Sequence, residues 1–273
     1  MRWACIGFGN VGQAIVHKLT ESGFLPQQVV VRNTEKITGY QNKFPDIQFI
    51  NSINQLQDGL DLVILCVPDN AIPEVTHSVS LKTTKPTIAH TSGAFPLEEL
   101  LKYTPKAGVV YPLQTFSVDF QPEWSTIPVL IEASALSLEI IMHFAQQLVS
   151  NPLWVSSADR AVIHLGAVWT SNFVNLMAWI AQEIVSSTIH SYQLYLPLMQ
   201  QVVEKLSNLT PAQAQTGPAK RNDIATIQHH INLLSAKNPE LVPLYQHLSR
   251  QIQKRTVHVP LNFDTNQYQP PLL

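Results

Sequence analysis

A glycine-rich hexapeptide near the start of the chain has the spacing GxGxxG. It follows an apolar run predicted to be a strand and opens an amphipathic run predicted to be a helix. In such a turn the first glycine permits a tight bend, the second lets the backbone approach a pyrophosphate, and the third allows close packing of helix on strand. The helix N-terminus adds free N–H groups and partial positive charge. The sequence therefore predicts a dinucleotide site, rather than a merely structural glycine turn, at Gly7, Phe8, Gly9, Asn10, Val11 and Gly12.

The residues after the second predicted strand bear on the choice between NAD and NADP. An NAD site places Asp or Glu there, to accept a hydrogen bond from the ribose 2′-OH. This chain has no carboxylate at the strand end and has Arg32 instead, which could stack on the adenine and pair with a 2′-phosphate. Arg32 could also be a solvated residue at a strand tip. The sequence favours NADP, with a phosphate site formed by Arg32, Asn33, Thr34 and Lys36.

Two later turns follow the ends of predicted strands. Ligands of open parallel sheets bind beyond the carboxyl ends of the strands, so these turns are expected to border the ribose and the nicotinamide. Cys66 is expected to be a small packed residue rather than a nucleophile, because no positive charge lies beside it in the sequence. The turn residues predicted to contact the cofactor are Cys66, Val67 and Pro68 in the first turn and His90, Thr91 and Ser92 in the second.

A polar stripe lies on a long apolar helix predicted over residues 158–187. His164, Ser171 and Asn172 fall near one face of it, at steps close to the helical period. Buried polar groups need partners, so such a stripe calls for an explanation. One interpretation is catalytic: His164 as acid and base, Asn172 orienting a carbonyl or carboxylate, and Ser171 contacting the substrate. The other is a set of hydrogen bonds between helices or at a dimer interface.

Two further groups are candidates for binding the substrate. Tyr111, Gln114 and Thr115 follow the end of a predicted strand and could line a cleft, or could be ordinary loop residues. Arg221 lies in a dense polar segment and could bind a substrate carboxylate in bidentate geometry. The alternative for Arg221 is a surface position in a capped loop between helices, because Asp223 is well placed to cap the next helix.

The order of elements predicts an α/β domain followed by an all-helical one. Short apolar runs alternate with helical patterns at first, which is typical of βαβ units and a parallel sheet, and the 3.6-residue period dominates from about Ser157. The predicted domains are a Rossmann domain (1–154), a helical substrate or dimerisation domain (155–256) and an extended tail (257–273). The predicted strands are 3–7, 29–32, 48–50, 60–67, 87–90 and 108–111, with 129–132 and 151–155 as further candidates, and the predicted helices are 11–22, 35–43, 71–80, 96–103, 137–149, 158–187, 191–208, 223–236 and 239–253.

Composition and charge exclude several classes of protein. Of the 273 residues, 45% are hydrophobic and 13% are charged, which rules out a disordered chain. The net charge of −2, without any run of Lys or Arg, argues against nucleic acid or an anionic membrane as the main partner. The apolar stretch 165–181 contains Thr, Ser and Asn residues, so we expect a helix buried inside protein rather than a membrane span.

The sequence also indicates the cellular compartment and argues against a metal site. Cys5 and Cys66 each lie inside an apolar run, which indicates buried thiols of a reducing compartment rather than a disulfide. The start of the chain lacks the pattern of a secretory signal, so a cytoplasmic location is predicted. No metal site is predicted, because the adjacent His229 and His230 would point about 100° apart on a helix.

The motifs resemble those of a known family. GFGNVG (7–12), VRNTEK (31–36) and VPDNAI (67–72) resemble the NADP-binding domain of pyrroline-5-carboxylate reductases and deazaflavin-dependent NADP reductases. The whole chain is similar to a bacterial family in which that domain precedes a helical domain of unknown function. The stretches that carry this wider resemblance are HTSGA (90–94), YPLQTFS (111–117), HLGAVWTSNF (164–173) and TGPAKRNDIATIQHH (216–230).

The resemblance implies a fold like that of 6-phosphogluconate dehydrogenase, and kinship with hydroxyacid dehydrogenases that form homodimers through a helical second domain. Those dehydrogenases carry a lysine on the long helix as acid and base. This chain has no Lys between Lys106 and Lys205, so another residue must move the proton if the reaction is similar.

Together these features predict an NADP(H)-dependent oxidoreductase acting on a small imine, ketone or hydroxyacid at an inter-domain cleft. The cofactor carries the chemistry and the protein supplies orientation. The alternative is a non-catalytic NADP-binding sensor or scaffold, which the absence of the lysine favours. A Rossmann-like interaction protein with an empty site is disfavoured, because the glycine turn is intact.

Overall fold

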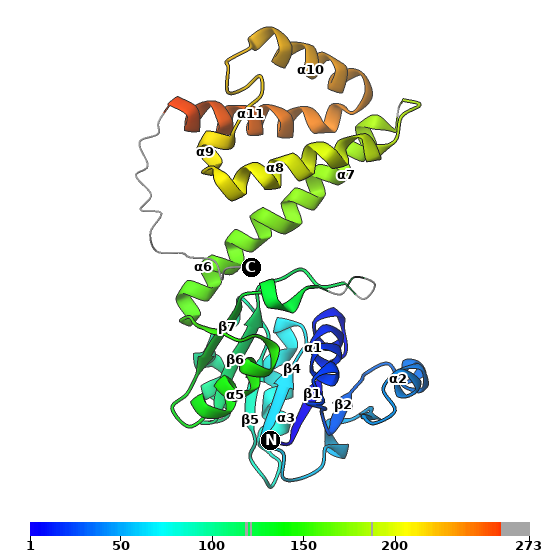
Figure 1. Cartoon of the computed structure of the whole chain (residues 1–273), viewed down its shortest axis with the longest axis vertical. Coiled ribbons are helices and arrows are strands. Elements are labelled where there is room, and N and C mark those ends of the chain that lie inside the picture. The colour runs from blue at the N-terminus through cyan, green and yellow to red at the C-terminus, as the bar shows by residue number, and fades with distance from the viewer. Residues whose placement is uncertain (118–119, 121, 187, 258–273) are drawn as a thin grey trace. The chain divides into compact units, whose positions relative to one another are not determined.

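The computed structural model describes residues 1–117, 120, 122–186 and 188–257 (Figure 1). They form two compact units, Met1–Val174 and a second that begins at Asn175. The division therefore falls inside the long helix, later in the chain than the predicted boundary at 154/155. Apart from Val257, the predicted tail 257–273 lies outside the described residues.

An eight-stranded sheet forms the centre of the first unit, in the order β3-β2-β1-β4-β5-β6-β7-β8. All neighbours pair in parallel except β6 and β7, which are antiparallel. Strands β2 and β3 are added on one side of β1, and β4 and the later strands on the other side. The point between β1 and β4 is therefore the topological switch point, where open α/β sheets bind ligands. The strands are β1 (Trp3–Ile6), β2 (Gln28–Val30), β3 (Gln48–Ile50), β4 (Leu62–Leu65), β5 (Thr87–His90), β6 (Ala107–Pro112), β7 (Val129–Ala133) and β8 (Leu153–Trp154).

Helices cover both faces of this sheet. α1 (Asn10–Glu21) and α5 (Leu138–Leu148) pack on one face, and α3 (Ile72–Ser80) and α4 (Leu97–Leu101) pack on the other. α2 (Ile37–Lys43) adds to the first layer near β3. The predicted Rossmann sheet is thereby confirmed, and the antiparallel β7 and the two-residue β8 are additions to the parallel pattern that was expected.

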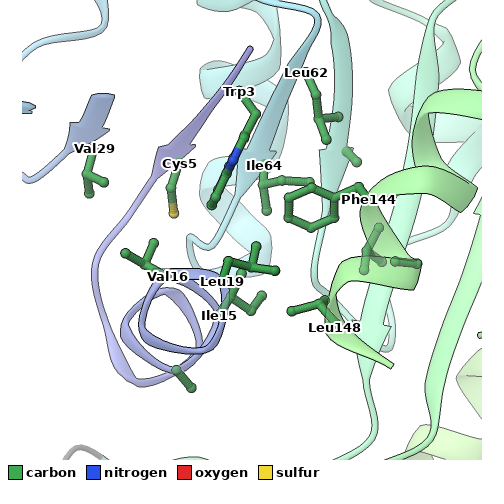
Figure 2. Packing of buried hydrophobic residues seen from close by; sticks show 14 of the residues in the cluster. Trp3, Cys5, Ile15, Val16, Leu19, Val29, Leu62, Ile64, Phe144 and Leu148 are labelled. Atoms are coloured by element: carbon green, nitrogen blue, oxygen red, sulfur yellow. The ribbon is translucent and has the colours of Figure 1, made fainter. Parts of the chain in front are cut away.

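Alternation along β1 shows how a continuous apolar run builds both layers. Trp3 and Cys5 point to the side of α1 and α5, whereas Ala4 and Ile6 point to the side of α3 and α4. Figure 2 shows Trp3 and Phe144 in this packing, and their ring centroids lie 5.1 Å apart. Burial of aromatic rings on one face and of aliphatic side chains on the other stabilises the β1–β4 centre, which holds the glycine turn in place.

The long helix begins at Ser157 and ends at Val185, and it has a π turn in its middle. It comprises α6 (Ser157–Ala167), the π turn (Val168–Asn172) and α7 (Phe173–Val185). The prediction that 165–181 is buried inside protein is wrong for the single chain, because Leu165, Trp169 and Trp179 are each about 60% exposed. Its apolar side chains have too few partners within the described residues to be covered.

The second unit contains only helices and turns among its described residues. The predicted helices 191–208, 223–236 and 239–253 are present, with differences of up to five residues at their ends. The short α9 was not predicted, although Thr210 caps it and Pro211 opens it. Beyond the end of α7, the elements are a 3₁₀ turn (Tyr192–Tyr195), α8 (Leu196–Asn208), α9 (Pro211–Ala214), α10 (Ile224–Lys237), a 3₁₀ turn (Pro239–Leu241) and α11 (Val242–Val257).

The helix Ser157–Val185 is long and apolar enough to cross a membrane by length and composition alone, with a mean hydropathy of 1.2 over its most apolar window. The same two criteria also admit helices that are covered by protein. Arg160 and His164 in its first half pack against the sheet of the first unit, so this part of the helix belongs to a folded α/β layer.

Candidate functional site

The glycine turn joins β1 to α1 through two close contacts that exclude any side chain. Gly7 has a φ of 95°, and a Cβ atom there would lie 2.3 Å from the carbonyl oxygen of Cys66. A Cβ on Gly12 would lie 2.3 Å from the carbonyl oxygen of Gly7. The predicted roles of these two glycines, a tight bend and close helix–strand packing, are therefore what the geometry requires.

Gly9 differs because it faces open space. It is exposed, and a Cβ there would meet nothing within 4 Å. It is also the N-cap of α1, no side chain caps that helix, and the first turn holds no acidic residue. The free N–H groups and partial positive charge at this end suit a diphosphate, so the residues present fit the pyrophosphate of a dinucleotide.

Two other residues of the motif are held by protein contacts. The ring of Phe8 is buried against Tyr40, Phe44 and Phe49, so only its backbone remains for a cofactor. The Asn10 amide Nδ2 donates to the carbonyl oxygen of Phe116 over 3.0 Å. Asn10 thus ties the glycine turn to the segment after β6. Val11 is half-buried and packs against the first core layer.

The predicted 2′-phosphate site lies after β2 and is open. Arg32, Asn33, Thr34 and Lys36 are all exposed. Asn33 accepts a hydrogen bond from the backbone N–H of Glu35, which shapes the turn. The side chains of Arg32 and Lys36 make no hydrogen bond or ion pair with the described residues, which leaves two cations available for a phosphate.

His90 lies beneath the turn that follows β5 and does not reach its surface. It is fully buried, and its Nδ1 accepts a hydrogen bond from the backbone N–H of Ser92 over 3.1 Å. Burial, together with the charge of Arg160, lowers the pKa of His90 to about 3. The predicted cofactor contact by this side chain is therefore corrected: neutral His90 shapes the turn, in which Thr91 is half-buried and Ser92 is buried.

The turn after β4 begins with Cys66, and the other thiol, Cys5, lies on the neighbouring strand β1. Cys66 is half-buried beside Gly12, and Val67 and Pro68 follow it towards the surface. The neighbouring Cys66 thiol and burial both raise the pKa of Cys5, whose Sγ donates to the Gly7 carbonyl oxygen. Both thiols are free, as expected, and Cys66 is more exposed than predicted.

A tyrosine and a histidine meet at the carboxyl end of β6. The hydroxyl of Tyr111 lies 3.0 Å from Nδ1 of His164, which reaches it from α6. Gly93, in the turn after β5, makes this possible, since a Cβ there would lie 2.6 Å from that nitrogen and 2.8 Å from Cζ of Tyr111. Burial raises the pKa of Tyr111, so its hydroxyl stays protonated at neutral pH and can donate.

The π turn makes a second contact with the segment after β6. The hydroxyl of Ser171 hydrogen-bonds that of Thr115, while the Gln114 side chain accepts from the backbone N–H of Thr115. Asn172 is exposed on the same π turn. The structure thus brings His164 and Ser171 from the long helix to the segment that carries Tyr111 and Thr115, while the catalytic role of the stripe stays a prediction.

A buried ion pair beside these residues was missed by the sequence analysis. Nη1 of Arg160 donates to Oε2 of Glu132 over 2.6 Å, and Arg160 is 1% exposed. Two signals could have revealed it. One is a carboxylate inside the buried run of β7, and the other is an arginine one turn before His164 on an apolar helix.

Arg221 lies in the second unit and is exposed, without a hydrogen bond or ion pair to any described residue. Asp223 accepts from the backbone N–H and the hydroxyl of Thr226, and these bonds lower the pKa of Asp223. The predicted cap is confirmed. Carboxylate binding by Arg221 stays a prediction.

Comparisons with known proteins bear on this geometry. Residues 2–92 match the family described as NADP oxidoreductase, coenzyme F420-dependent, and residues 127–252 match a domain of unknown function, DUF2520. A protein of Bacteroides fragilis, provisionally described as an NADP oxidoreductase, is 30% identical over 93% of this chain and 98% of that chain, with a TM-score of 0.86. The chain belongs to this family of NADP oxidoreductases.

More distant structures share the fold. A reductive aminase of Aspergillus terreus, in complex with NADPH and ethyl levulinate, is 15% identical, covers 94% of this chain and 96% of its own, and has a TM-score of 0.69. A pyrroline-5-carboxylate reductase of Coxiella burnetii is 17% identical, covers 94% and 97%, and has a TM-score of 0.57. Comparison with curated protein sequences gives no match.

Family membership confirms three predictions: the pair of domain types, the oxidoreductase class and NADP as the coenzyme. It favours an enzyme over the alternative of a sensor or scaffold. The roles of the individual site residues are a separate question, which depends on the geometry of this chain.

Proposed function

We propose that this oxidoreductase transfers hydride between NADP(H) and the carbon of a small imine, ketone or hydroxyacid, with His164 as the acid and base. The observation that carries this proposal is the Tyr111–His164 hydrogen bond at the carboxyl ends of β5 and β6. The glycine turn follows β1 at the same edge of the parallel sheet. Cofactor and proton donor would therefore share one edge, where such sheets bind ligands.

The cofactor would bind across the switch point. The pyrophosphate would lie on the N-terminus of α1 above Gly9, and Arg32, with Lys36, Asn33 and Thr34 near it, would hold the 2′-phosphate. Backbone atoms of Phe8, Thr91, Ser92, Val67 and Pro68 would border the ribose and nicotinamide. When bound, NADPH supplies the hydride, and the protein supplies orientation and the proton.

The proton would pass through Nε2 of His164. Tyr111 stays protonated, so its hydroxyl can donate to Nδ1, and that donation would favour the tautomer with the proton on Nε2. His164 is half-exposed, so Nε2 can reach a substrate while Nδ1 is held. This pair supplies an acid and base from the long helix, which has no lysine.

The substrate would be small and polar at its reacting centre. Neutral donors and acceptors lie on the two segments that carry Tyr111 and His164: the hydroxyls of Thr115 and Ser171 bond one another, and Gln114 and Asn172 are exposed. Such groups can orient a carbonyl, imine or hydroxyl by hydrogen bonds. The reductive aminase that shares the fold, crystallised with a keto ester, supports this class. Exposed and unpaired, Arg221 is retained as the proposed carboxylate ligand.

We also propose a cytoplasmic homodimer formed through the helices from residue 155 onward, with 1–154 as the cofactor domain. Large apolar side chains exposed on these helices support a covered face. They include Trp169, Phe173, Trp179, Leu198 and Val203.

The decisive experiment measures NADPH binding by calorimetry and then NADPH oxidation with a panel of small cyclic imines, keto acids and ketones. His164→Ala should lower kcat by about 100-fold or more while NADPH affinity changes less than about twofold. The exposed His143 on α5 provides the matched control, His143→Ala, which should leave both unchanged. Wild-type turnover that survives His164→Ala would refute the assignment of His164.

A further inference from the structure

Arg160 makes three hydrogen bonds, and together they join three separate segments of the first unit. Besides the 2.6 Å bond from Nη1 to Glu132 on β7, its Nη2 donates to the Phe95 carbonyl oxygen over 2.7 Å and to Oγ of Ser157 over 3.2 Å. Ser157 in turn donates to both carboxylate oxygens of Glu132, through its N–H and its hydroxyl. The N–H of Leu97 donates to Oγ of Ser157 and closes the network.

Each segment in this network also carries a part of the candidate site. Phe95 lies two residues after Gly93, whose missing side chain admits His164. Glu132 pairs with Val109 on β6, two residues before Tyr111, so Glu132 lies beside the strand that carries the tyrosine. Arg160 itself is one helical turn before His164 on α6.

Burying the charge of an arginine costs desolvation free energy unless the guanidinium is paired and hydrogen-bonded. Arg160 is 1% exposed, and a buried ion pair stabilises a fold little compared with well-packed apolar groups of similar volume. Its two Nη groups nevertheless donate to different segments and so fix directions that apolar packing would leave free, while its buried Nε has no hydrogen-bond partner among the described residues. The arrangement therefore favours a role in fixing geometry over a role in stability.

We infer that Arg160 is a positioning residue: with Glu132, it fixes the first turn of α6 against β7 and the Gly93 turn, so that His164 meets the hydroxyl of Tyr111. The expected loss of kcat rests on the proposed function. The expected displacement of His164 rests on the hydrogen-bond geometry alone. Arg160 touches neither of the two reacting side chains and acts through the segments that hold them.

Electrostatics are consistent with this position. The charge of Arg160 opposes the effect of burial on the pKa of Tyr111, and it helps to lower the pKa of His90. Among the described residues, His164 from α6 hydrogen-bonds the Tyr111 hydroxyl and Arg160 from α6 acts on its pKa, while Glu132 from β7 pairs with Arg160 and the pKa of His90 from β5 responds to the same arginine. Loss of the Arg160 charge should therefore move the alkaline limb of a pH–rate profile, to which Tyr111 contributes, to higher pH.

The test compares Arg160→Met with the double variant Arg160→Met/Glu132→Met. The single variant leaves a buried unpaired carboxylate and should lower Tm, whereas the double variant removes both charges and should recover most of that loss. If Arg160 positions His164, both variants should lose about 100-fold in kcat, with KM for NADPH changed less than about twofold. Recovery of kcat together with Tm in the double variant would overturn the inference.

A second measurement does not depend on turnover. Nitrogen-15 NMR of the His164 imidazole reports which nitrogen carries the proton and whether Nδ1 accepts a hydrogen bond. The wild type should show Nδ1 as the acceptor, and both variants should show a mixture of tautomers. If the wild type shows the held tautomer but no substrate turns over, the proposed function fails while the positioning role stands. An unchanged His164 spectrum in the double variant would refute the positioning role.

Discussion

Gly93 shows how much a candidate site can depend on an atom that is absent. Its φ is not in the left-handed region, so no backbone requirement selects glycine there. The requirement comes from two side chains far along the chain, Tyr111 and His164, which occupy the volume that a methyl group would need. Such a requirement cannot be predicted from local sequence, because the partners lie on β6 and α6.

Gly93→Ala should separate Tyr111 from His164. The added methyl group would lie 2.6 Å from Nδ1 of His164, so the imidazole must move and the 3.0 Å hydrogen bond should be lost. We expect about 1–3 kcal/mol of destabilisation and at least a tenfold fall in kcat, measured by urea unfolding and NADPH oxidation.

Gly166 on α6 offers the matched control. A Cβ there meets nothing within 4 Å, so Gly166→Ala should keep kcat and add up to about 1 kcal/mol of stability through helix propensity. Equal kinetics for the two alanine variants would contradict the steric role of Gly93.

Arg32 should decide the coenzyme preference. Arg32→Asp removes a phosphate ligand and supplies a carboxylate for the ribose 2′-OH, so NADPH affinity should fall by about 10- to 100-fold while NADH affinity rises. Calorimetric titration with both coenzymes measures the change. Lys85→Asp makes a similar charge change just before the amino end of β5, whereas the cofactor is proposed to bind at the carboxyl ends of the strands. This variant should alter neither affinity. Retention of the NADPH preference in Arg32→Asp would contradict the assignment.

At the scale of elements, local patterns predicted the α/β half well and the contacts between elements poorly. Glycine spacing and apolar runs placed β1, α1 and β4, because both depend on neighbours in sequence. The π turn, the antiparallel pairing of β7 and the Glu132–Arg160 pair depend on distant partners, so no local pattern indicates them. Thr210-Pro211 lies between the predicted helices 191–208 and 223–236 and is the start of α9, since Thr and Pro favour the N-cap and first helical positions.

The burial of His90 at the end of β5 makes the first unit sensitive to acid. Its pKa falls from 6.5 to about 3 on folding, so between those values the unfolded chain binds a proton that the folded chain does not. Stability due to His90 is therefore present above pH 6.5 and is lost as pH falls, by up to about 1.4 kcal/mol per pH unit.

His90→Asn should remove this dependence, because the Asn side chain can still accept from the N–H of Ser92 but does not titrate. Urea unfolding from neutral pH down to about pH 4 should show a shallower loss of stability than in the wild type, by roughly one proton. The exposed His247 gives the control: His247→Asn should keep the wild-type slope. A His90→Asn slope equal to that of the wild type would show that His90 titrates normally.

At the scale of the whole molecule, the distribution of exposed apolar side chains separates the sheet-forming part from the helices. Most large apolar residues that are exposed lie from Val162 onward, whereas the strands β1 to β7 are almost completely buried. The helical pattern of this stretch was predicted correctly, and 165–181 was predicted to be buried inside protein. Hydrophobicity alone does not say whether a side chain is covered by its own chain or by another.

The proposed homodimer accounts for this exposure, and Trp179 tests it. Light scattering after size exclusion should give twice the 30.5 kDa chain mass for the wild type. Trp179 is 60% exposed on α7, so Trp179→Asp would place a charge in the covered face and should yield monomer with an intact sheet by circular dichroism. Leu81, 72% exposed at the end of α3, provides the control: Leu81→Asp should remain dimeric because it lies outside the helices proposed to associate. A wild-type monomer at tens of micromolar would leave the exposed helices without a second copy to cover them and would exclude the dimer.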